Sequence, residues 1–459
     1  MTTDLENLLP SQETPVEYVT TTDGTVAKKS SVCAKTKKKI KLKKKSTKGN
    51  EFKRYGIAFL IGFFLCLIFS SIPYTSRKKA DAPQNVPDDN DSKCQKRIIG
   101  YYNGARSITE EQIEKLTHII FNGVKMQKDG VINFANDEQR LKFHDMKNKA
   151  RNMKSDVQLL FATDAYKDNN KLVAPVMAEP KSRKIWINSI ASFILEQELD
   201  GVEIVYRWPE TSEDRKNFAL FVRELRYKLA RVEKIAKRTV PYIISIYSPA
   251  YNWATKDVSL LDDIRNYVDF FNVETDNFYA PYHKNNIMTG PLSPLYSLGN
   301  DDKSIDRTME KYTCKTMKPS QLNIILSFGG VHWENVHKSS AEPDDIHFYV
   351  RGRDYSGYHF TWRYLKFFGF NLKEASFHDV AKTSYIWDKN HRSFVTFENE
   401  RSLEEKMEYI LSKNLGGVAI DRIDKDDDSH TLLNAVTSMN MCSGPKFAED
   451  EIKYNCGKL

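Results

Sequence analysis

The sequence predicts an α/β protein: a (β/α)8 TIM barrel with a small α+β insertion between strands 7 and 8, preceded by one transmembrane helix. Short apolar runs alternate with longer amphipathic runs from residue 97 onward, and this alternation repeats eight times. An uncharged run of 18 residues precedes it. The chain has 459 residues, 40% hydrophobic and 28% charged, which excludes collagen-like, disordered and disulfide-dense small proteins.

The positive charge lies mainly in the amino-terminal tail. Residues 1–54 contain 13 Lys and Arg but six Asp and Glu, so the other residues carry about +1 of the formal net charge of +8. A nucleic-acid partner is therefore not expected. We expect residues 1–54 to form a disordered cytoplasmic tail, because they are polar and without apolar periodicity.

Residues 55–72 carry no charge and end at Pro73, and as a helix they are about 27 Å long, close to the thickness of a hydrocarbon core. Eleven Lys and Arg lie at 35–54 and four at 75–94, which predicts a type II signal anchor over 55–74 with the following domain extracellular or luminal. A buried core helix has no neighbouring apolar partner. A cleaved signal peptide would need a leader of unusual length. The Lys run could instead be a nuclear signal or bind anionic lipid.

Residues 75–95 read as a polar stalk that contains one glycosylation sequon, at Asn90. The cysteines on the predicted outer side are Cys94, Cys314, Cys442 and Cys456, the last two in a tail at 441–459. We expect disulfides among these four, with three pairings left open. No Cys/His spacing indicates a metal site, and no cofactor is expected.

The expected barrel strands are 97–102, 117–124, 157–163, 200–206, 241–247, 268–274, 322–328 and 416–421. The expected helices are 137–153, 182–197, 212–236, 258–266, 303–316, 400–413 and 429–439. A doubly wound open sheet is the alternative, but residues 102–105 are not a Gly-rich phosphate turn. The insertion, at about 331–396, is rich in aromatic residues, more typical of a small core than of a ligand groove.

Four segments resemble glycoside hydrolase family 18, the chitinases and chitinase-like barrels, over about 96–440. They are Tyr-Tyr at 101–102, Leu-Asp-Gly-Val-Glu-Ile-Val-Tyr-Arg-Trp-Pro at 199–209, Ser-Ile-Asp at 304–306 with Ile-Leu-Ser-Phe-Gly-Gly at 325–330, and Tyr-Ile-Trp-Asp at 385–388 with the residues up to Val418. The resemblance implies the barrel fold. It does not establish activity, which depends on the site.

The resemblance also assigns the catalytic positions on the fourth strand. In family chitinases the last acid of the motif protonates the glycosidic oxygen, and the acid two residues earlier orients the substrate's N-acetyl group. Here the donor position is Arg207 and the orienting position is Val205, while Glu203 keeps the first acid. Arginine stays protonated and valine accepts no hydrogen bond, so the family's hydrolysis is excluded.

Positions that the family uses to hold sugar have also changed. The seventh-strand motif has Gly330 in place of arginine, and the eighth-strand tryptophan position is Asp421. The candidate ligand-binding residues are Tyr101, Trp208, Asp276, Asn277, Trp333 and Asp421. We also consider that Arg207 forms an ion-pair cluster with Glu203, Asp276 and Asp421, or that each substitution arose independently.

The sequence therefore predicts a catalytically inactive, membrane-anchored chitinase-like protein that binds chitin or another glycan, or a protein. A role in defence or remodelling is implied by the resemblance alone. Two alternatives remain: a residual or altered glycoside hydrolase that uses Glu203 or Asp421, and a structural or signalling pseudoenzyme with no sugar ligand.

Overall fold

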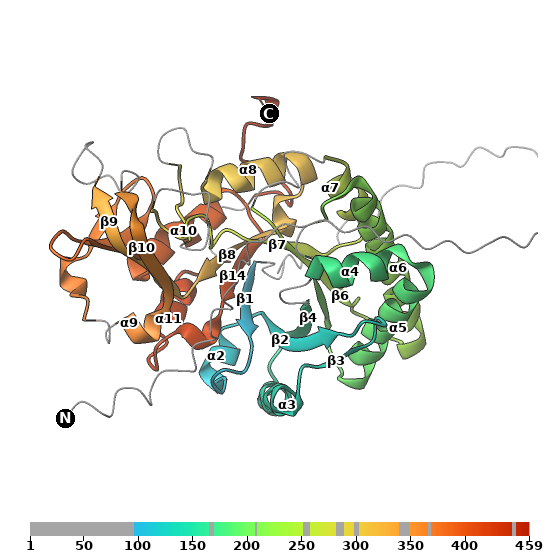
Figure 1. The fold of residues 1–459 in the computed structure, drawn as a ribbon. Helices are drawn as coiled ribbons and strands as arrows, with labels where there is room; N and C mark the ends of the chain where they lie inside the picture. Colours follow the sequence, from blue (N-terminus) through green and yellow to red (C-terminus); the bar gives the residue numbers. More distant parts are fainter. Residues whose placement is uncertain are drawn as a thin grey trace, which may run out of the picture. The chain divides into compact units, whose positions relative to one another are not determined.

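The computed structural model describes residues 96–458, except 165–168, 207–208, 251–257, 281–288, 298–302, 339–348, 366–368 and 443–446 (Figure 1). The expected tail, membrane span and stalk, with Cys94 and Asn90, lie outside the described residues. No helix in the described ranges is long and apolar enough to cross a membrane. The span at 55–74 therefore stays a prediction. Residues 89–459 form one compact unit, which is the part described below.

A closed barrel of parallel strands forms the centre of this unit. Its strands are β1 (Arg97–Tyr102), β2 (His118–Met126), β4 (Gln158–Asp164), β5 (Gly201–Val205), β6 (Ile243–Ser248), β7 (Phe270–Val273), β8 (Leu322–Ser327) and β14 (Gly417–Asp421). They pair in parallel in the order β1-β14-β8-β7-β6-β5-β4-β2, and a parallel pairing of β1 with β2 closes the ring. This confirms the predicted TIM barrel. The additional strand β3 (Ile132–Phe134) runs antiparallel to β2.

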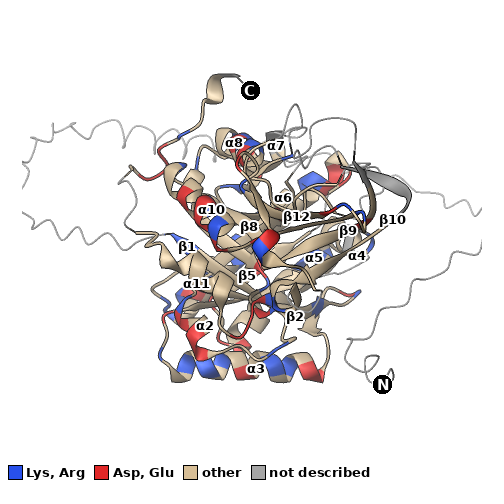
Figure 2. Ribbon diagram, turned by 90° about the vertical axis from the view of Figure 1, so that its left-hand side faces the viewer, with Lys and Arg blue, Asp and Glu red and all other residues tan. Residues whose placement is uncertain are grey.

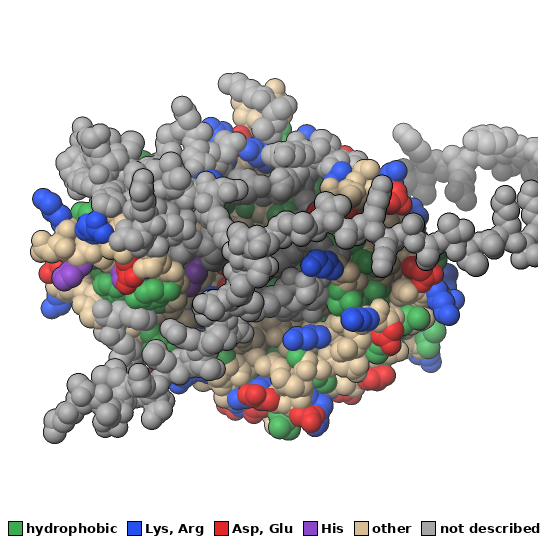
Figure 3. Space-filling model, in the orientation of Figure 1, with side chains coloured by type: hydrophobic (Ala, Val, Ile, Leu, Met, Phe, Trp, Pro, Cys, Tyr) green, Lys and Arg blue, Asp and Glu red, His purple; other side chains and the backbone are tan. Residues whose placement is uncertain are grey.

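Helices surround the barrel (Figure 1). They are α2 (Glu110–Glu114), α3 (Asp137–Asn152), α4 (Asn169–Ala178), α5 (Pro180–Glu196), α6 (Ser212–Ala236), α7 (Val258–Ile264), α8 (Ile305–Thr316), α10 (Glu400–Ser412) and α11 (Thr431–Ser438). The exposed side of α3 carries charges of both signs (Figure 2), and the described surface in Figure 3 likewise mixes them. This pattern is typical of solvated helix faces.

Local sequence explains the helix boundaries. In α6, Thr211 and Asp214 form a reciprocal capping box, and Lys237 ends the helix in a left-handed conformation. Buried residues of α6 recur every three or four positions, from Phe218 to Val232, so one face packs on the barrel. The predicted range 212–236 is confirmed. The sequence analysis did not predict α2, α4 and β3, which are short or weakly periodic.

Between β8 and α10, a second sheet with a short helix occupies the region where the insertion was expected. Its elements are β9 (Gly329–Lys338), β10 (Tyr349–Thr361), α9 (Trp362–Leu365), β11 (Ser376–His378), β12 (Thr383–Asp388) and β13 (Ser393–Phe397). The strands are antiparallel in the order β10-β9-β13-β12-β11. Most of the described residues of this region lie in strands, and α9 has only four residues, so the α+β expectation is met mainly by its β part.

Alternating strand side chains divide the barrel core into two layers. Those that point inward include Ile99, Tyr101, Val205 and Ala419 and form a small inner cluster. Those that point outward, such as Ile204, join the large cluster beneath the helices. The inner layer is therefore a packed interior and not a pore.

The carboxyl-terminal tail is fastened where the barrel strands begin. The Asn414 side chain donates to the Ala448 and Glu451 carbonyls and accepts from the Lys96 ammonium group, at 3.1, 3.2 and 3.2 Å. A disulfide joins Cys314 of α8 to Cys456. Cys442 is also disulfide-bonded. Of the three pairings left open, the structure therefore selects the one that contains Cys314–Cys456.

Candidate functional site

The inward-facing residues of β5 lead to the end of the barrel where the strands finish. Glu203 and Val205 point into the barrel interior, while Val202 and Ile204 pack against the surrounding helices. This is the strand register that the sequence predicts. Catalytic residues of TIM-barrel enzymes are found at this end of the strands.

Glu203 is fully buried and held by two hydrogen bonds to one oxygen. The Tyr101 hydroxyl donates to Glu203 Oε1 at 2.9 Å, and Asn272 Nδ2 donates to the same atom at 2.7 Å. Burial raises the pKa of Glu203 to about 7, although hydrogen bonds from Asn272 and Tyr101 oppose the rise. Tyr101 was a candidate ligand-binding residue, but its hydroxyl is engaged here and its side chain is buried.

The Glu203 carboxyl ends a line of buried amide hydrogen bonds. Asn323 Nδ2 donates to Asn272 Oδ1 at 2.8 Å, and Arg97 Nε donates to Asn323 Oδ1 at 3.0 Å. Polar side chains thus run through the barrel from the start of β1 to the middle of β5. They fix the position of Glu203, since a shift of the carboxyl would break bonds to two other strands.

Val205 occupies the next inward position on β5 and packs in the apolar inner cluster with Tyr101. Its backbone N–H donates to Thr163 Oγ1 of β4 at 3.1 Å. No polar group of the Val205 side chain is available to orient a substrate. Arg207 and Trp208 lie outside the described residues.

Asp276 and Asn277 follow β7, and their side chains are half-buried. Among the described residues, neither Oδ1 atom has a hydrogen-bond partner, although both are shielded from solvent. Burial, with the nearby carboxylates of Asp421 and Glu274, raises the pKa of Asp276 to about 8. Glu274 Oε1 accepts from the Tyr247 hydroxyl at 2.9 Å. Glu274 and Asp276, which follow β7, thus lie near Asp421, the last residue of β14.

Asp421, at the end of β14, forms an ion pair with Lys425 at 2.9 Å. Lys425 Nζ also donates to the Asp421 carbonyl at 2.9 Å and to Ser327 Oγ at 3.2 Å. Among the described residues, Lys425 is thus the cationic side chain paired with Asp421. The sequence analysis did not assign it to the site. Its position four residues after Asp421 was the signal that could have identified it.

Trp333 is the candidate that the structure removes from the site. Its side chain is completely buried in the large core cluster, so it has no face to stack on a ligand. In β9, an added Cβ at Gly330 would lie 2.1 Å from the Thr396 carbonyl oxygen. This position, where the family has arginine, has no room for a side chain.

The acidic loop after β14 caps a helix. Asp426 is buried and accepts hydrogen bonds from the backbone N–H groups of Leu432 and Leu433, at the start of α11. Within the described ranges, no group of three or more His, Cys, Asp or Glu side chains could hold a metal ion.

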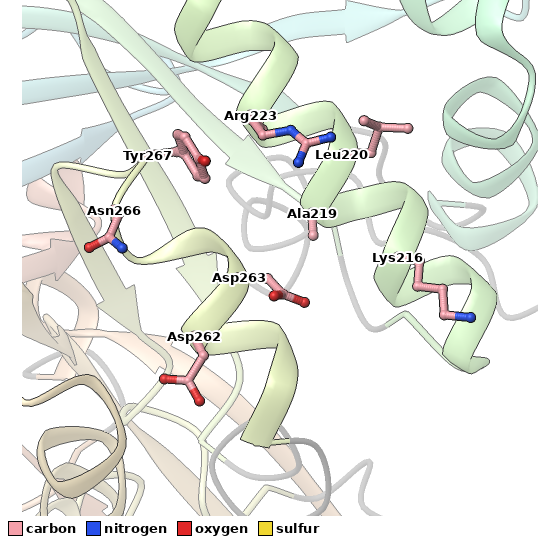
Figure 4. A pocket seen from close by; sticks show the side chains of 8 residues that line it. All are labelled: Lys216, Ala219, Leu220, Arg223, Asp262, Asp263, Asn266 and Tyr267. Atoms are coloured by element: carbon pink, nitrogen blue, oxygen red, sulfur yellow. The ribbon is translucent and has the colours of Figure 1, made fainter. Parts of the chain in front are cut away.

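A separate groove lies between α6 and α7 on the outside of the barrel (Figure 4). Lys216 and Arg223 line one wall, and Asp262 and Asp263 line the other, with Tyr267 at one end. Its helices belong to the outer ring, so the groove is distinct from the inward-facing residues of β5.

Comparison with known proteins identifies related chains. The model of Glycosyl hydrolases family 18 matches residues 97–426. Chitinase A1 of Niallia circulans is 21% identical over 312 residues, which cover 62% of this chain and 43% of the relative. The oviduct-specific glycoprotein of Mesocricetus auratus is 22% identical over 336 residues, covering 68% and 46%. The match thus spans less than half of either relative.

Among solved structures, human YKL-39, described as a pseudo-chitinase with retained chitooligosaccharide binding properties, superimposes with a TM-score of 0.63. It shares 16% sequence identity, and the superposition covers 75% of this chain and 99% of that one. At this identity the likeness shows the fold.

Proposed function

Because the chain belongs to glycosyl hydrolases family 18, we propose that it is a catalytically inactive chitinase-like protein that acts by binding a ligand. The observation that carries the proposal is Val205, an apolar side chain at the inward position next to Glu203. The sequence places Arg207 two residues further along. At these two positions a substrate would find neither an acceptor for its acetamide nor a transferable proton.

Glu203 and Asp421, the two acids considered as alternative donors, are poorly suited to replace the lost one. Glu203 is completely buried and its Oε1 already accepts two hydrogen bonds. Asp421 is already engaged in an ion pair with Lys425, at 2.9 Å. Loss of a positioned acid costs about 10²–10⁴ in rate, and here the orienting acid is lost as well.

Turnover of a fluorogenic N-acetylglucosamine oligomer by the full chain tests this proposal. We expect no release above the rate without protein. The Glu203→Gln and Asp421→Asn variants serve as controls for the two alternative acids. Release by the parent chain that either substitution abolishes would show that the protein is an altered hydrolase.

We propose a glycan as the ligand, with a protein as the second candidate. The glycan proposal is supported by the family and by YKL-39, described as a pseudo-chitinase that retains binding. Binding of chitin oligosaccharides to the full chain can be measured by calorimetry, with Trp208→Ala as the test variant. Tyr364→Ala is the control, because Tyr364 is exposed on the insertion. If the parent chain does not bind these oligosaccharides, the alternative of a structural or signalling pseudoenzyme with no sugar ligand is favoured.

We also propose that residues 55–74 anchor the chain as a type II membrane protein. The support is the uncharged run itself and the excess of Lys and Arg before it. Flotation of the full chain with lipid vesicles, resistant to alkaline extraction, tests the anchor. Glycan attachment at Asn90, removed by Asn90→Gln, tests the topology.

A further inference from the structure

Several large apolar side chains are exposed at the end of the barrel where its strands begin. Leu195 is 46% exposed, Ile235 83%, Val240 58% and Met317 50%. We call the surface formed by these four residues the strand-start face. Exposed apolar residues that gather on one surface indicate a contact site, whereas single ones scattered over a protein do not.

The topology places these four residues at one end of the barrel. Leu195 and Ile235 lie in the last turns of α5 and α6, Val240 follows α6, and Met317 caps the carboxyl end of α8. Each of these helices leads into a barrel strand, namely β5, β6 or β8, and these strands are parallel. All four residues therefore lie at the end opposite the candidate site.

Hydrogen bonds join the segments that lie between Ile235 and Met317 at this end. Arg226 of α6 donates to the Tyr242 and Tyr267 carbonyls, ahead of β6 and β7, at 2.8 and 2.9 Å. Arg265 donates to the Thr316 carbonyl, next to Met317, at 2.8 Å. The four residues of the strand-start face lie at the starts of β5, β6 and β8, and the hydrogen-bonded start of β7 lies between the last two.

Cationic side chains accompany the apolar ones. Lys234 and Lys237 flank Ile235, and Lys318 follows Met317. None of the three forms an ion pair with a carboxylate in the part of the chain that the structure describes. Exposed apolar residues next to unpaired lysines are typical of protein surfaces that rest on a bilayer, where the apolar groups enter the interface and the lysines meet phosphates.

The chain enters the barrel at this same end. Lys96 precedes β1, and its ammonium group donates to the Leu415 carbonyl ahead of β14 at 2.6 Å. Residues 73–95 join Lys96 to the apolar run at 55–72. Twenty-three residues span at most about 80 Å when extended, so the strand-start face is within reach of a membrane that holds that run.

We propose that the strand-start face rests on the lipid surface, so that the open end of the barrel faces away from the membrane. This inference depends on the proposed membrane anchor. The ligand is then a phospholipid bilayer, which Ile235 and Val240 enter at the level of the headgroups. A second copy of the chain is the competing occupant.

Fluorescence quenching of the full chain in lipid nanodiscs tests the inference. Ile235→Trp and Val240→Trp each add one indole at an exposed position. Leu141→Trp is the control, because Leu141 is 62% exposed and lies near the amino-terminal end of α3, away from the strand-start face. The added emission is compared between nanodiscs of ordinary and of brominated phosphatidylcholine. Flotation of each variant with vesicles is measured first.

We expect brominated lipid to reduce the added emission at positions 235 and 240 at least twofold and to leave that at 141 unchanged. If the chains float but brominated lipid reduces the added emission equally at all three positions, the inference is overturned and the anchor is retained. Emission at 235 that is blue-shifted but unquenched would overturn it in favour of a second copy. Chains that do not float would refute the anchor and this inference together.

Discussion

The Tyr101 hydroxyl and the Glu203 carboxyl are joined by a 2.9 Å hydrogen bond across the interior of the barrel, between β1 and β5. Both side chains are buried, and the same Glu203 oxygen also accepts from Asn272. The acid that the family motif retains here is thus held by the barrel's own side chains, a structural role that does not require a substrate.

Glu203→Gln should change how stability depends on pH. Burial raises the pKa of Glu203 from 4.5 to about 7, so the folded state holds a proton that the unfolded state releases. Its stabilising contribution is complete below pH 4.5 and lost as the pH rises to about 7. The variant should therefore gain up to about 3 kcal/mol relative to the parent across this window. Urea unfolding between pH 4 and 8 measures it, and parallel profiles would contradict the expectation.

Tyr101→Phe should lower the free energy of unfolding by about 1–3 kcal/mol, because it removes a buried hydrogen bond to a carboxyl group. It should also raise the pKa of Glu203 further, since the Tyr101 bond opposes the rise. Tyr206→Phe is the matched control: Tyr206 is equally buried, and its hydroxyl makes no hydrogen bond among the described residues. Equal losses for both variants would show that the Tyr101 bond contributes nothing.

Asp421→Asn should lower the pKa of Asp276 from about 8, because the Asp421 carboxylate is one of the charges that raise it. Carboxyl carbon chemical shifts of labelled protein, followed from pH 5 to 9, report the titration. Asp428→Asn removes an exposed carboxylate of the following loop that pairs with Arg363, and it should leave Asp276 unchanged. An unaltered Asp276 titration in Asp421→Asn would exclude the coupling.

Gly330→Ala should destabilise the insertion by about 1–3 kcal/mol, since the new Cβ would lie 2.1 Å from the Thr396 carbonyl oxygen. Gly457→Ala is the control, because the nearest atom there is 3.7 Å away. Guanidinium unfolding with a probe in the insertion measures the difference. Similar stability of both variants would show that β9 and β13 can move apart to accept the methyl group without loss of stability.

Removing the disulfide with Cys314→Ser and Cys456→Ser should reduce the free energy of unfolding by about 2–4 kcal/mol, because the bond closes a long loop, with a sequence separation of 142. The midpoint of thermal unfolding measures the loss. Reducing agent should lower the midpoint of the parent but much less that of the variant. A variant as stable as the parent would show that the tail is held by its other contacts.

The fold could be predicted well because helices and strands have different periodicities. The ranges expected for α6 and β1 match the structure to the residue, and the others differ by a few residues at their ends. The strand register was sufficient to place Glu203 and Val205 inside the barrel. The missed elements α2 and α4 are, respectively, five residues long and interrupted by Pro175.

The site itself was only partly predictable, because side-chain contacts between distant strands leave no local pattern. Asn272 bonds to Glu203, 69 residues earlier, and nothing around Asn272 in the sequence indicates that contact. Trp333 was misjudged for a related reason: alternation in a sheet shows which residues share a face but not which face is covered. Only the three-dimensional packing of β9 shows that Trp333 points inward.

The contacts of Asn414 have a practical consequence for protein engineering. This one side chain binds both Lys96 and the backbone of residues 448–451, so the two ends of the folded unit meet at one edge. A short linker between them and new termini opened in the exposed turn at residues 389–391 would give a circular permutant with every barrel strand intact. Such a permutant would release the barrel from its amino-terminal segment while keeping the order in which its strands pair.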